Sequence, residues 1–410
     1  MQAPGHLVVQ DRYGAAMSDP RDLLDADTLR ARGGLKWTGM HADIAAWVAE
    51  SDLGVAPPVL EAVHDAVGRG LLGYLPPAVR ATLGEAFAAW ADGAYGWRVD
   101  PDRVRPVGHV TEGLRLAIDL FSRPGSPVIL PTPAYMPFVT APEVWGRQVL
   151  QVPMVRDGVG RPTIDLDAVD AAFRAGGHLF VLVNPQNPTG RVAARAELEA
   201  LAEVVERHGG RVFADEIHAP LVHAPGRHVP YASLSPATAA HTITGVSASK
   251  AWNIPGLKCA QVVLTADDDL RTWLRHDDLL TEGASTVGAL ANAAAYTHGG
   301  PWLADTLRYL DGNRTALAQG LGDGTRVGYR MPEGTYLAWL DLREALAALP
   351  AGAGPGDEPL GRWLRRTTGV ALTDGALCGQ AGTGHVRVNL AMPRPLVVEA
   401  GRRLAACLDR

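Results

Sequence analysis

Three strand-like runs, and the polar residues that follow them, decide the fold. Residues 178–184 read His-Leu-Phe-Val-Leu-Val-Asn, residues 211–215 read Arg-Val-Phe-Ala-Asp, and residues 242–246 read Thr-Ile-Thr-Gly-Val. Similar short runs occupy residues 127–131 and 260–264. Several of these runs are apolar on both faces, which is typical of strands buried in a parallel sheet. Together they predict a layered α/β domain.

Helical segments separate these runs. Residues 193–208 carry leucine and valine at helical spacing and are followed by Gly209-Gly210, so they predict a crossover helix. Residues 111–121 carry a second apolar stripe and predict another helix. Residues 349–361 are rich in Ala, Gly and Pro and predict a surface loop.

The chain has 410 residues, which is too long for one compact core. We predict that residues 1–55 form an N-terminal arm and part of a small domain, and that residues 56–301 form a large domain. Residues 302–410 alternate strands, at 336–340 and 386–390, with helices and predict a smaller α+β domain. The first 35 residues are polar and irregular, which predicts a mobile arm.

The composition excludes several classes of protein. The formal net charge is −6 and no basic block occurs, so nucleic acid is not an expected partner. The three cysteines, Cys259, Cys378 and Cys407, have no metal-like spacing and favour a reducing compartment. Neither a signal peptide nor an apolar stretch long enough to span a membrane is recognisable. We therefore predict a cytoplasmic protein without a membrane partner.

The chain contains only three lysines, Lys36, Lys250 and Lys258, among 38 Lys and Arg side chains. A lysine amine can lose its proton near neutral pH and attack a carbonyl, whereas the guanidinium pKa of arginine is too high. One interpretation is that a lysine is kept for chemistry. The alternative is that the three lysines are leftovers of a composition bias, and the count alone leaves this alternative open.

Polar residues follow three of the predicted strands, at the place where an open α/β sheet binds its ligands. The first group is Asn184-Pro-Gln-Asn-Pro-Thr-Gly190, the second is Asp215-Glu-Ile-His218, and the third is Ser247-Ala-Ser-Lys250. Each group has a simple structural interpretation, as a turn, an acidic helix cap or a Ser-rich loop. Their occurrence together and in this order favours a binding site.

The sequence lacks the motifs that three other kinds of site require. An acidic pair followed by His also occurs in nucleotide-hydrolysing motors, but these need a Gly-Lys-[Ser/Thr] phosphate loop, and no lysine of this chain follows glycine. A metal site is not expected, since neither His-Glu-x-x-His nor Cys-x-x-Cys occurs. The glycines of residues 352–356 lack the βαβ context of a dinucleotide loop.

A lysine after one strand and an aspartate at the end of another suit pyridoxal 5′-phosphate (PLP). The amine of Lys250 would form a Schiff base with the aldehyde, and Asp215 would keep the ring nitrogen protonated so that the ring can accept electrons. The amide of Asn187 is the candidate donor to the phenolic oxygen of the ring.

From Lys36 to Arg394 the sequence resembles fold-type-I PLP enzymes of the class I/II aminotransferase superfamily, and within it the branch of cystathionine and cysteine-S-conjugate β-lyases. The resemblance implies a large domain with a mixed, mostly parallel sheet between helices, and a smaller α+β domain. It is carried by the following segments: Trp47-Val-Ala-Glu-Ser-Asp52, Gly73-Tyr74, Pro133-Ala-Tyr135, the three groups above with their continuation to Leu257, Pro332 to Leu340, and Val386-Arg-Val-Asn389.

The resemblance also implies roles for residues around the cofactor. Tyr135 would stack on the pyridine ring, and Ser247 and Lys258 would bind the phosphate. Lys258, a point charge eight residues after Lys250, also suits a phosphate dianion on physical grounds. The helix that begins at Val110 and Thr111 would offer its N–H groups to the same phosphate.

Three further residues complete the candidate site. His218 lies three residues after Asp215, where many aminotransferases have tyrosine and the lyase branch has histidine; a purely structural histidine remains an alternative. Arg387 is the candidate anchor of the substrate α-carboxylate, because a guanidinium grips two oxygens at once. By the same resemblance, Tyr74 would reach the phosphate of a neighbouring subunit, which implies a homodimer with shared active sites.

These residues serve two reactions of amino acids. We predict a C–S β-lyase that cleaves cystathionine or a cysteine S-conjugate to thiol, pyruvate and ammonia. The alternative is an aminotransferase of a specialised biosynthetic pathway. Relatives read Trp-Val-Ala-Asp-Met-Asp-Phe where this chain has Glu50, Ser51 and Leu53, and Leu75-Pro76-Pro77 replaces polar and aromatic residues, so the substrate is left open. A ligand sensor in a transcription regulator is not expected, since the N-terminal region cannot supply a helix-turn-helix domain.

Overall fold

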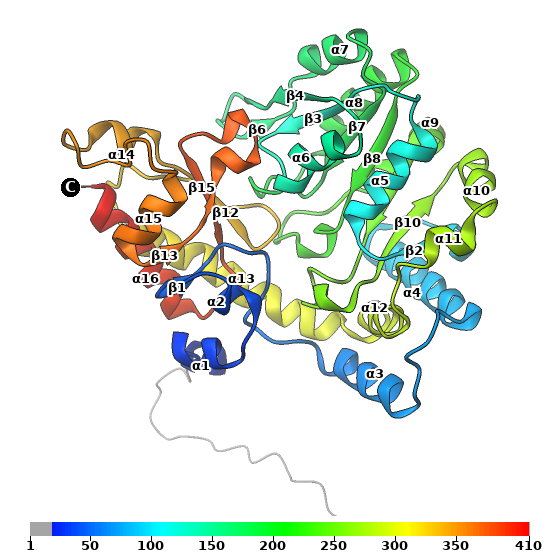
Figure 1. The fold of residues 1–410 in the computed structure, drawn as a ribbon, viewed down its shortest axis with the longest axis horizontal. Coiled ribbons are helices and arrows are strands. Elements are labelled where there is room, and N and C mark those ends of the chain that lie inside the picture. The colour runs from blue at the N-terminus through cyan, green and yellow to red at the C-terminus, as the bar shows by residue number, and fades with distance from the viewer. Residues whose placement is uncertain (1–18, 410) are drawn as a thin grey trace, which may run out of the picture.

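Two sheets of unequal size organise the chain. The structure is a computed structural model that describes residues 19–409. A seven-stranded sheet lies at the centre of the larger lobe and a four-stranded sheet in the smaller one (Figure 1). The predicted architecture, a mixed and mostly parallel sheet between helices beside a smaller α+β part, is confirmed.

The seven-stranded sheet has the order β2-β10-β9-β8-β7-β3-β4. The pairs from β9 to β4 are parallel, whereas β10 is antiparallel to both β9 and β2. The strands are β2 (Val104–Val107), β3 (Val128–Thr132), β4 (Val149–Pro153), β7 (Leu179–Val183), β8 (Arg211–Asp215), β9 (Thr242–Val246) and β10 (Ala260–Leu264). All five strands predicted for the large domain are confirmed, but residues 260–264 do not run parallel to their neighbours.

Helices cover both faces of this sheet, as the apolar runs require. In β7, Leu179, Val181 and Val183 pack with the helices of one face, whereas Phe180 and Leu182 pack with those of the other. The first face is covered by α5 (Val110–Phe121), α6 (Met136–Val144) and α10 (Asp267–Leu274), and the second by α7 (Leu166–Arg174) and α8 (Arg195–Arg207). The predicted crossover helix is α8, and the second predicted helix is α5.

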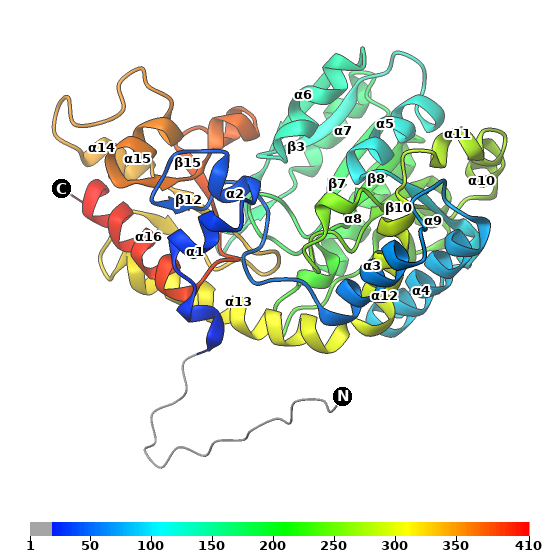
Figure 2. The same ribbon diagram turned by 60° about the horizontal axis from the view of Figure 1, so that its bottom comes forward.

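A third group of helices packs beside the antiparallel end of the sheet. These are α3 (Pro57–Gly68), α4 (Pro77–Tyr95), α12 (Thr286–His298) and α13 (Gly300–Leu321). In Figure 2, α13 runs from beneath the larger lobe to the smaller one. Its first half contributes Leu303 and Leu310 to the core of the larger lobe, and its second half contributes Leu317 to the core of the smaller lobe.

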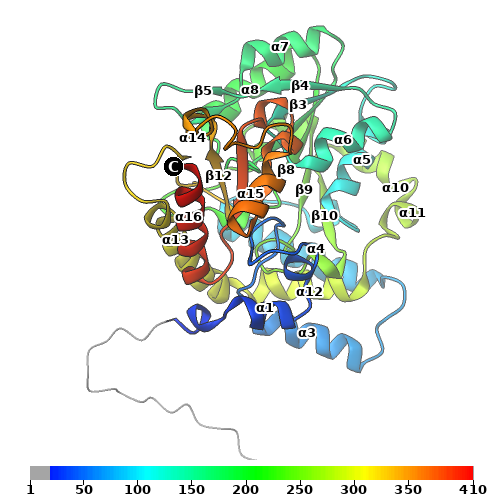
Figure 3. The same ribbon diagram turned by 60° about the vertical axis from the view of Figure 1, so that its left-hand side comes forward.

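The four-stranded sheet of the smaller lobe is antiparallel, in the order β11-β12-β15-β14. Its strands are β11 (Gly328–Tyr329), β12 (Leu337–Asp341), β14 (Thr373–Asp374) and β15 (His385–Asn389). It is packed by α14 (Arg343–Ala348), α15 (Leu360–Thr368) and α16 (Arg394–Leu408), and α16 lies along α13 (Figure 3). The predicted loop at residues 349–361 connects α14 to α15.

The N-terminal region joins the smaller lobe. The first strand, β1 (Ile44–Ala45), pairs in parallel with β13 (Val370–Ala371). The prediction of an irregular arm over the first 35 residues is wrong for its described part, because residues 20–23 form a 3₁₀-helix and α1 (Ala26–Ala31) follows it. Residues 1–18 lie outside the described residues. The remaining elements are α2 (Leu35–Thr38), β5 (Val155–Arg156), β6 (Pro162–Thr163), α9 (Pro236–His241) and α11 (Asp277–Thr281).

Neither a membrane-spanning helix nor a metal-binding group is found within residues 19–409. No helix in this range combines the length and the apolar character that crossing a membrane requires. Groups of His, Cys, Asp and Glu that could hold a metal ion do not occur in the same range. The three cysteines are buried and carry free thiols.

Two glycines on helices give a matched test of the packing. An added Cβ at Gly288 of α12 would lie 2.1 Å from the Leu257 carbonyl oxygen, whereas nothing lies within 4 Å of one at Gly93 of α4. We expect Gly288→Ala to lower the free energy of unfolding by about 1–3 kcal/mol through overpacking. Gly93→Ala should raise it by about 0.5–1 kcal/mol, because alanine favours the helix. Urea unfolding measures both, and shifts of equal sign would contradict this packing.

Candidate active site

The three polar groups that follow β7, β8 and β9 meet at one edge of the seven-stranded sheet. The register pairs Val183 with Asp215 and Asp215 with Gly245, so the carboxyl ends of these parallel strands lie side by side. They open into a cavity of about 380 Å³. Nine of the predicted site residues line it: Val110, Thr111, Tyr135, Asn187, Asp215, His218, Ser247, Lys250 and Lys258. Tyr74 and Arg387 are not among its lining residues.

Lys250 follows β9, and its amine lies within the cavity. Its Nζ donates a hydrogen bond to the backbone oxygen of Ala49, over 3.0 Å. Burial lowers the Lys250 pKa to about 8, helped by the positive charge of Arg387 and opposed by the negative charge of Asp215. A lysine with this pKa is partly unprotonated near neutral pH, which is the state that attacks a carbonyl.

Asp215 is the last residue of β8 and is 5% exposed. Its Oδ1 accepts a hydrogen bond from the amide of Ile217, over 3.1 Å. Burial raises the Asp215 pKa to about 7, against the lowering effects of that hydrogen bond and of Lys250. A cation bound beside this carboxyl would favour its ionised form.

Arg387 approaches the cavity from β15 of the smaller lobe and is 2% exposed. Its Nη1 donates to Asn187 Oδ1 over 3.0 Å. Its Nη2 donates to the Trp47 backbone oxygen over 2.9 Å and to Thr373 Oγ1 over 3.1 Å. Because the Asn187 oxygen faces a guanidinium, the amide nitrogen of Asn187 is the donor left for a ligand.

His218 lies deep in the same cavity. Burial, together with the charges of Lys250 and Arg387, lowers the His218 pKa to about 3, so the ring is neutral. Its Nδ1 is buried and has no hydrogen-bond partner among the described residues. The edge of the ring faces Tyr336, with 6.0 Å between the ring centroids.

The N-terminus of α5 presents backbone amides to the cavity. His109 caps the helix, because its Nδ1 accepts from the Glu112 amide over 3.0 Å. Glu112 in turn accepts from the Gly108 amide through Oε2, over 2.8 Å. The amides of Val110 and Thr111 stand at the first two helical positions, where a helix offers no acceptor of its own. Such amides suit an anion.

Ser247 and Lys258 both line the cavity but differ in their hydrogen bonding and exposure. The Ser247 hydroxyl donates to the Cys259 backbone oxygen over 2.8 Å and accepts from the Ser249 amide over 3.0 Å. It is therefore engaged within the protein, and a phosphate contact would require its proton to turn away from Cys259. Lys258 is exposed, with a positive φ of 48°.

Tyr74 lies in the connection between α3 and α4, away from the cavity of its own chain. Its side chain is 92% exposed. With Gly73 and Leu75 it borders a separate hollow of about 790 Å³, which Arg80 also lines. An aromatic side chain this exposed has no packing role within its own subunit.

Ala49 and His109 are among the cavity residues that the sequence reasoning missed. Ala49 contributes a backbone oxygen to Lys250, and a backbone group leaves no signal in the sequence. His109 lines the cavity and caps α5. A histidine directly before the predicted helix was the signal that could have found it, because this position needs a side chain that accepts a hydrogen bond.

Comparisons with known proteins agree with this site. The family model described as aminotransferase class I and II matches residues 48–404. A cystathionine β-lyase of Corynebacterium glutamicum is 35% identical, over 94% of this chain and 99% of the relative. A cystathionine β-lyase of Bacillus subtilis is 29% identical, over 90% of this chain and 94% of the relative. The PLP-bound C–S lyase from Staphylococcus hominis matches with a TM-score of 0.84 and 27% identity, over 92% of this chain and 96% of that chain.

The matched residues 48–404 include every residue that lines the cavity. The predicted resemblance, the fold type and the cofactor are confirmed. The chain belongs to the class I and II aminotransferase family, as an enzyme of fold type I that depends on PLP.

Proposed function

We propose that this protein is a PLP-dependent carbon–sulfur β-lyase, which cleaves cystathionine or a cysteine S-conjugate to a thiol, pyruvate and ammonia. The observation that carries the proposal is the cavity in which Lys250 and Asp215 lie at adjacent strand ends while Arg387 approaches from the smaller lobe. Relatives with a lyase name, 35% identical over nearly the full length, support the reaction type.

The donor set of the cavity fits the groups of PLP. The Lys250 amine would form a Schiff base with the aldehyde, and Asp215 would pair with the protonated ring nitrogen. The amide nitrogen of Asn187 would donate a hydrogen bond to the phenolic oxygen. His218, whose buried Nδ1 lacks a partner among the described residues, and Tyr135 would flank the ring. The phosphate would be held by the amides of Val110 and Thr111, with Ser247 and Lys258 beside them.

The residues divide the reaction between them. When bound, PLP supplies an electron sink for the pair of electrons that remains after the α-proton leaves. Lys250 removes that proton from the amino-acid substrate as general base, and Asp215 keeps a positive charge beside it stable in a buried site. The C–S bond then breaks with its electron pair on sulfur, and the thiolate takes a proton. Water converts the remaining 2-aminoacrylate to pyruvate and ammonia.

Arg387 sets the orientation of the substrate. Its guanidinium would bind the α-carboxylate, while Asn187, Thr373 and the Trp47 oxygen hold the guanidinium in place. A carboxylate fixed in this way directs the α-hydrogen toward Lys250. Arg387 is 2% exposed, so water competes little with this contact.

The second candidate reaction is transamination. It would use the same base, the same ring partner and the same carboxylate anchor, and it differs in where the proton returns. Glu50, Ser51 and Leu53 depart from the lyase pattern in the segment beside Ala49, which favours a substrate other than that of common relatives.

The two reactions are separated by one assay. The purified protein is incubated with PLP and an S-alkyl cysteine, without any 2-oxo acid. We expect catalytic release of pyruvate and thiol, because elimination needs no amino acceptor. Thiol is measured with a chromogenic disulfide and pyruvate with lactate dehydrogenase. Turnover that begins only after a 2-oxo acid is added would instead establish the aminotransferase.

The lowered pKa of Lys250 predicts how the apoenzyme takes up the cofactor. The amine attacks an aldehyde only when it is unprotonated, so the rate of uptake should rise with pH up to about 8, the value set by burial, and then level off. The visible absorbance that develops after mixing measures this rate between pH 6 and 10. Lys250→Ala should develop no such band and should lose about 10³-fold or more in pyruvate formation. A rate that is still rising with pH between 9 and 10 would show an unshifted amine.

We also propose that the enzyme is a homodimer whose active sites are shared. The support is Tyr74, which is 92% exposed and outside the cavity of its own chain. Leu72, at 68% exposure, lies beside it. A partner subunit would bury both residues and receive the Tyr74 hydroxyl at its phosphate site.

Subunit mixing tests the shared site. Lys250→Ala and Tyr74→Ala are each expected to be nearly inactive. When the two are unfolded together and refolded in equal amounts, hybrid dimers should place a native Lys250 and a native Tyr74 at one site, which restores about one quarter of the parent activity. Recovery no greater than the sum of the separate proteins would contradict shared sites.

Two further proposals concern the domain bounds and the cellular location. We propose that residues 56–301 form the large domain and that residues 1–55 and 302–410 belong to the small one, supported by the separate apolar cores of the two lobes. We also propose a cytoplasmic location, supported by three buried free thiols.

A further inference from the structure

One of the three lysines has no part in the proposed chemistry. Lys36 belongs to α2 and is 1% exposed. A lysine is almost never buried to this degree without a partner, because removing its charge from water is costly. In a chain that uses arginine for nearly all of its cations, a buried lysine calls for a specific contact.

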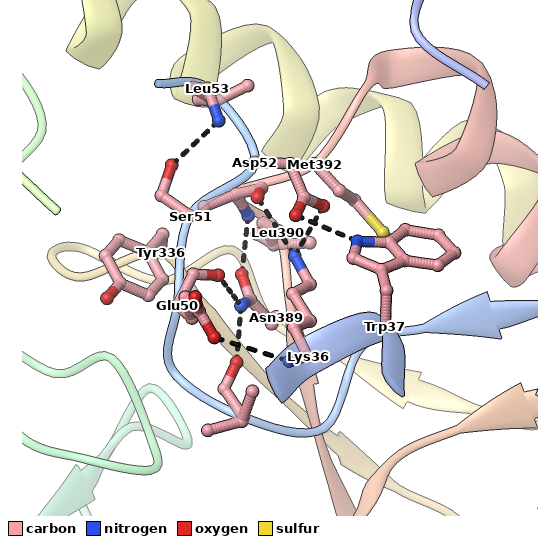
Figure 4. Close-up of polar contacts among 12 residues, drawn as sticks. Lys36, Trp37, Glu50, Ser51, Asp52, Leu53, Tyr336, Asn389, Leu390 and Met392 are labelled. Carbon is pink, nitrogen blue, oxygen red and sulfur yellow. Dashed lines mark hydrogen bonds and ion pairs between the residues drawn. The ribbon is translucent and has the colours of Figure 1, made fainter. Parts of the chain in front are cut away.

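That contact is an ion pair with Asp52, shown in Figure 4. The Lys36 Nζ lies 2.7 Å from Asp52 Oδ2 and donates a second hydrogen bond to the Ala391 oxygen over 3.1 Å. Asp52 Oδ1 accepts from Trp37 Nε1 over 2.9 Å, and the Asp52 amide donates to the same Ala391 oxygen over 2.9 Å. The charge of Asp52 opposes the lowering of the Lys36 pKa by burial. Helix α2 and the loop after β15 are thereby tied to residue 52.

Residue 52 lies in the segment whose backbone oxygens accept hydrogen bonds from Lys250 and Arg387. In residues 47–52, the Trp47 oxygen accepts from Arg387 and the Ala49 oxygen accepts from Lys250. Tyr336 also donates to Ala49, over 3.1 Å. This stretch, which we name the substrate segment, therefore sets where both side chains stand.

The substrate segment is held from both lobes. Asn389 of β15 donates through Nδ2 to the oxygens of Val48 and Glu50, over 2.6 and 2.7 Å. Asn253, three residues after Lys250, accepts from the Ser51 amide over 3.0 Å and donates to the Ser51 oxygen over 2.8 Å. Within this arrangement the pair of Lys36 and Asp52 supplies the charged contact at the C-terminal end of the segment (Figure 4).

We infer that Lys36 is a positioning residue, which through its buried ion pair with Asp52 fixes the substrate segment and thereby the backbone oxygens that hold Lys250 and Arg387. Lys36 is not among the residues that line the cavity and its amine binds Asp52, so its effect passes through the segment. The expected consequence is on substrate capture by Arg387. This inference rests on the proposed function for its kinetic part only.

The main variant is Lys36→Met in the PLP-loaded enzyme, since methionine keeps much of the length and removes the charge. Hydrogen exchange of a peptide spanning residues 46–54 should become about tenfold faster or more, while exchange in β7 and β8 stays at the parent rate. With an S-alkyl cysteine, KM should rise about tenfold and kcat should change less than about threefold, because Arg387 is displaced and Lys250 is not lost. The visible band of the cofactor should persist.

Two controls separate positioning from general loosening. Leu404→Ala empties a fully buried place in the core of the smaller lobe without touching the substrate segment, and it should lower the melting temperature with unchanged KM. The double variant Lys36→Met with Asp52→Asn removes the unpaired charge, so its melting temperature should recover toward the parent value while KM and exchange stay raised.

The test of the role of Lys36 can be separated from the test of the reaction type. If the parent cleaves no cysteine S-conjugate, the proposed function fails, and exchange over residues 46–54 still decides whether Lys36 fixes the segment. If exchange is unchanged in Lys36→Met, the inference is wrong. It is equally wrong if Leu404→Ala raises KM to the same extent, or if KM in the double variant returns to the parent value together with the melting temperature.

Discussion

Burial of charge at the ends of parallel strands is the constraint on which the site depends. Asp215 and Lys250 ordinarily have pKa values that lie far apart, yet burial raises the first to about 7 and lowers the second to about 8. Two groups so matched can hold or release a proton near neutral pH at little cost. Helices pack on both apolar faces of the sheet whose strand ends carry the two groups. The core of the larger lobe therefore sets the chemistry as well as the stability.

In the proposed function, the smaller lobe contributes recognition of the substrate carboxylate. Arg387 is carried by β15, which is antiparallel to its neighbours, and reaches across to Asn187 in the larger lobe. The substrate segment lies between the lobes and bonds to Asn389 on one side and to Asn253 on the other. The helix α13 contributes to the cores of both lobes and so connects the lobe of the proposed base with the lobe of the proposed anchor. The proposed base is thus carried by one lobe and the proposed carboxylate anchor by the other.

Much of this arrangement could be predicted from the sequence. The rest could not, for physical reasons. The runs at residues 211–215 and 242–246 coincide with β8 and β9, because buried parallel strands need apolar side chains on both faces. The direction of β10 does not follow from its composition, since buried strands of either direction are apolar. The role of the Ala49 oxygen is invisible because backbone groups are common to all residues. The ion pair of Lys36 joins residues 16 positions apart through a fold that only tertiary packing defines.

The placement of the three lysines has a practical consequence for handling the enzyme. Lys36 is buried and Lys250 lies within the cavity, so Lys258, near the proposed phosphate position, is the exposed lysine of the described chain. Apart from the α-amino group of the chain, amine-reactive dyes, glutaraldehyde and activated-ester resins would consequently attach at Lys258, beside the proposed phosphate position. Immobilisation through Lys258 would therefore block the proposed cofactor site. Coupling through carboxylates, or through an engineered surface thiol, is the compatible route.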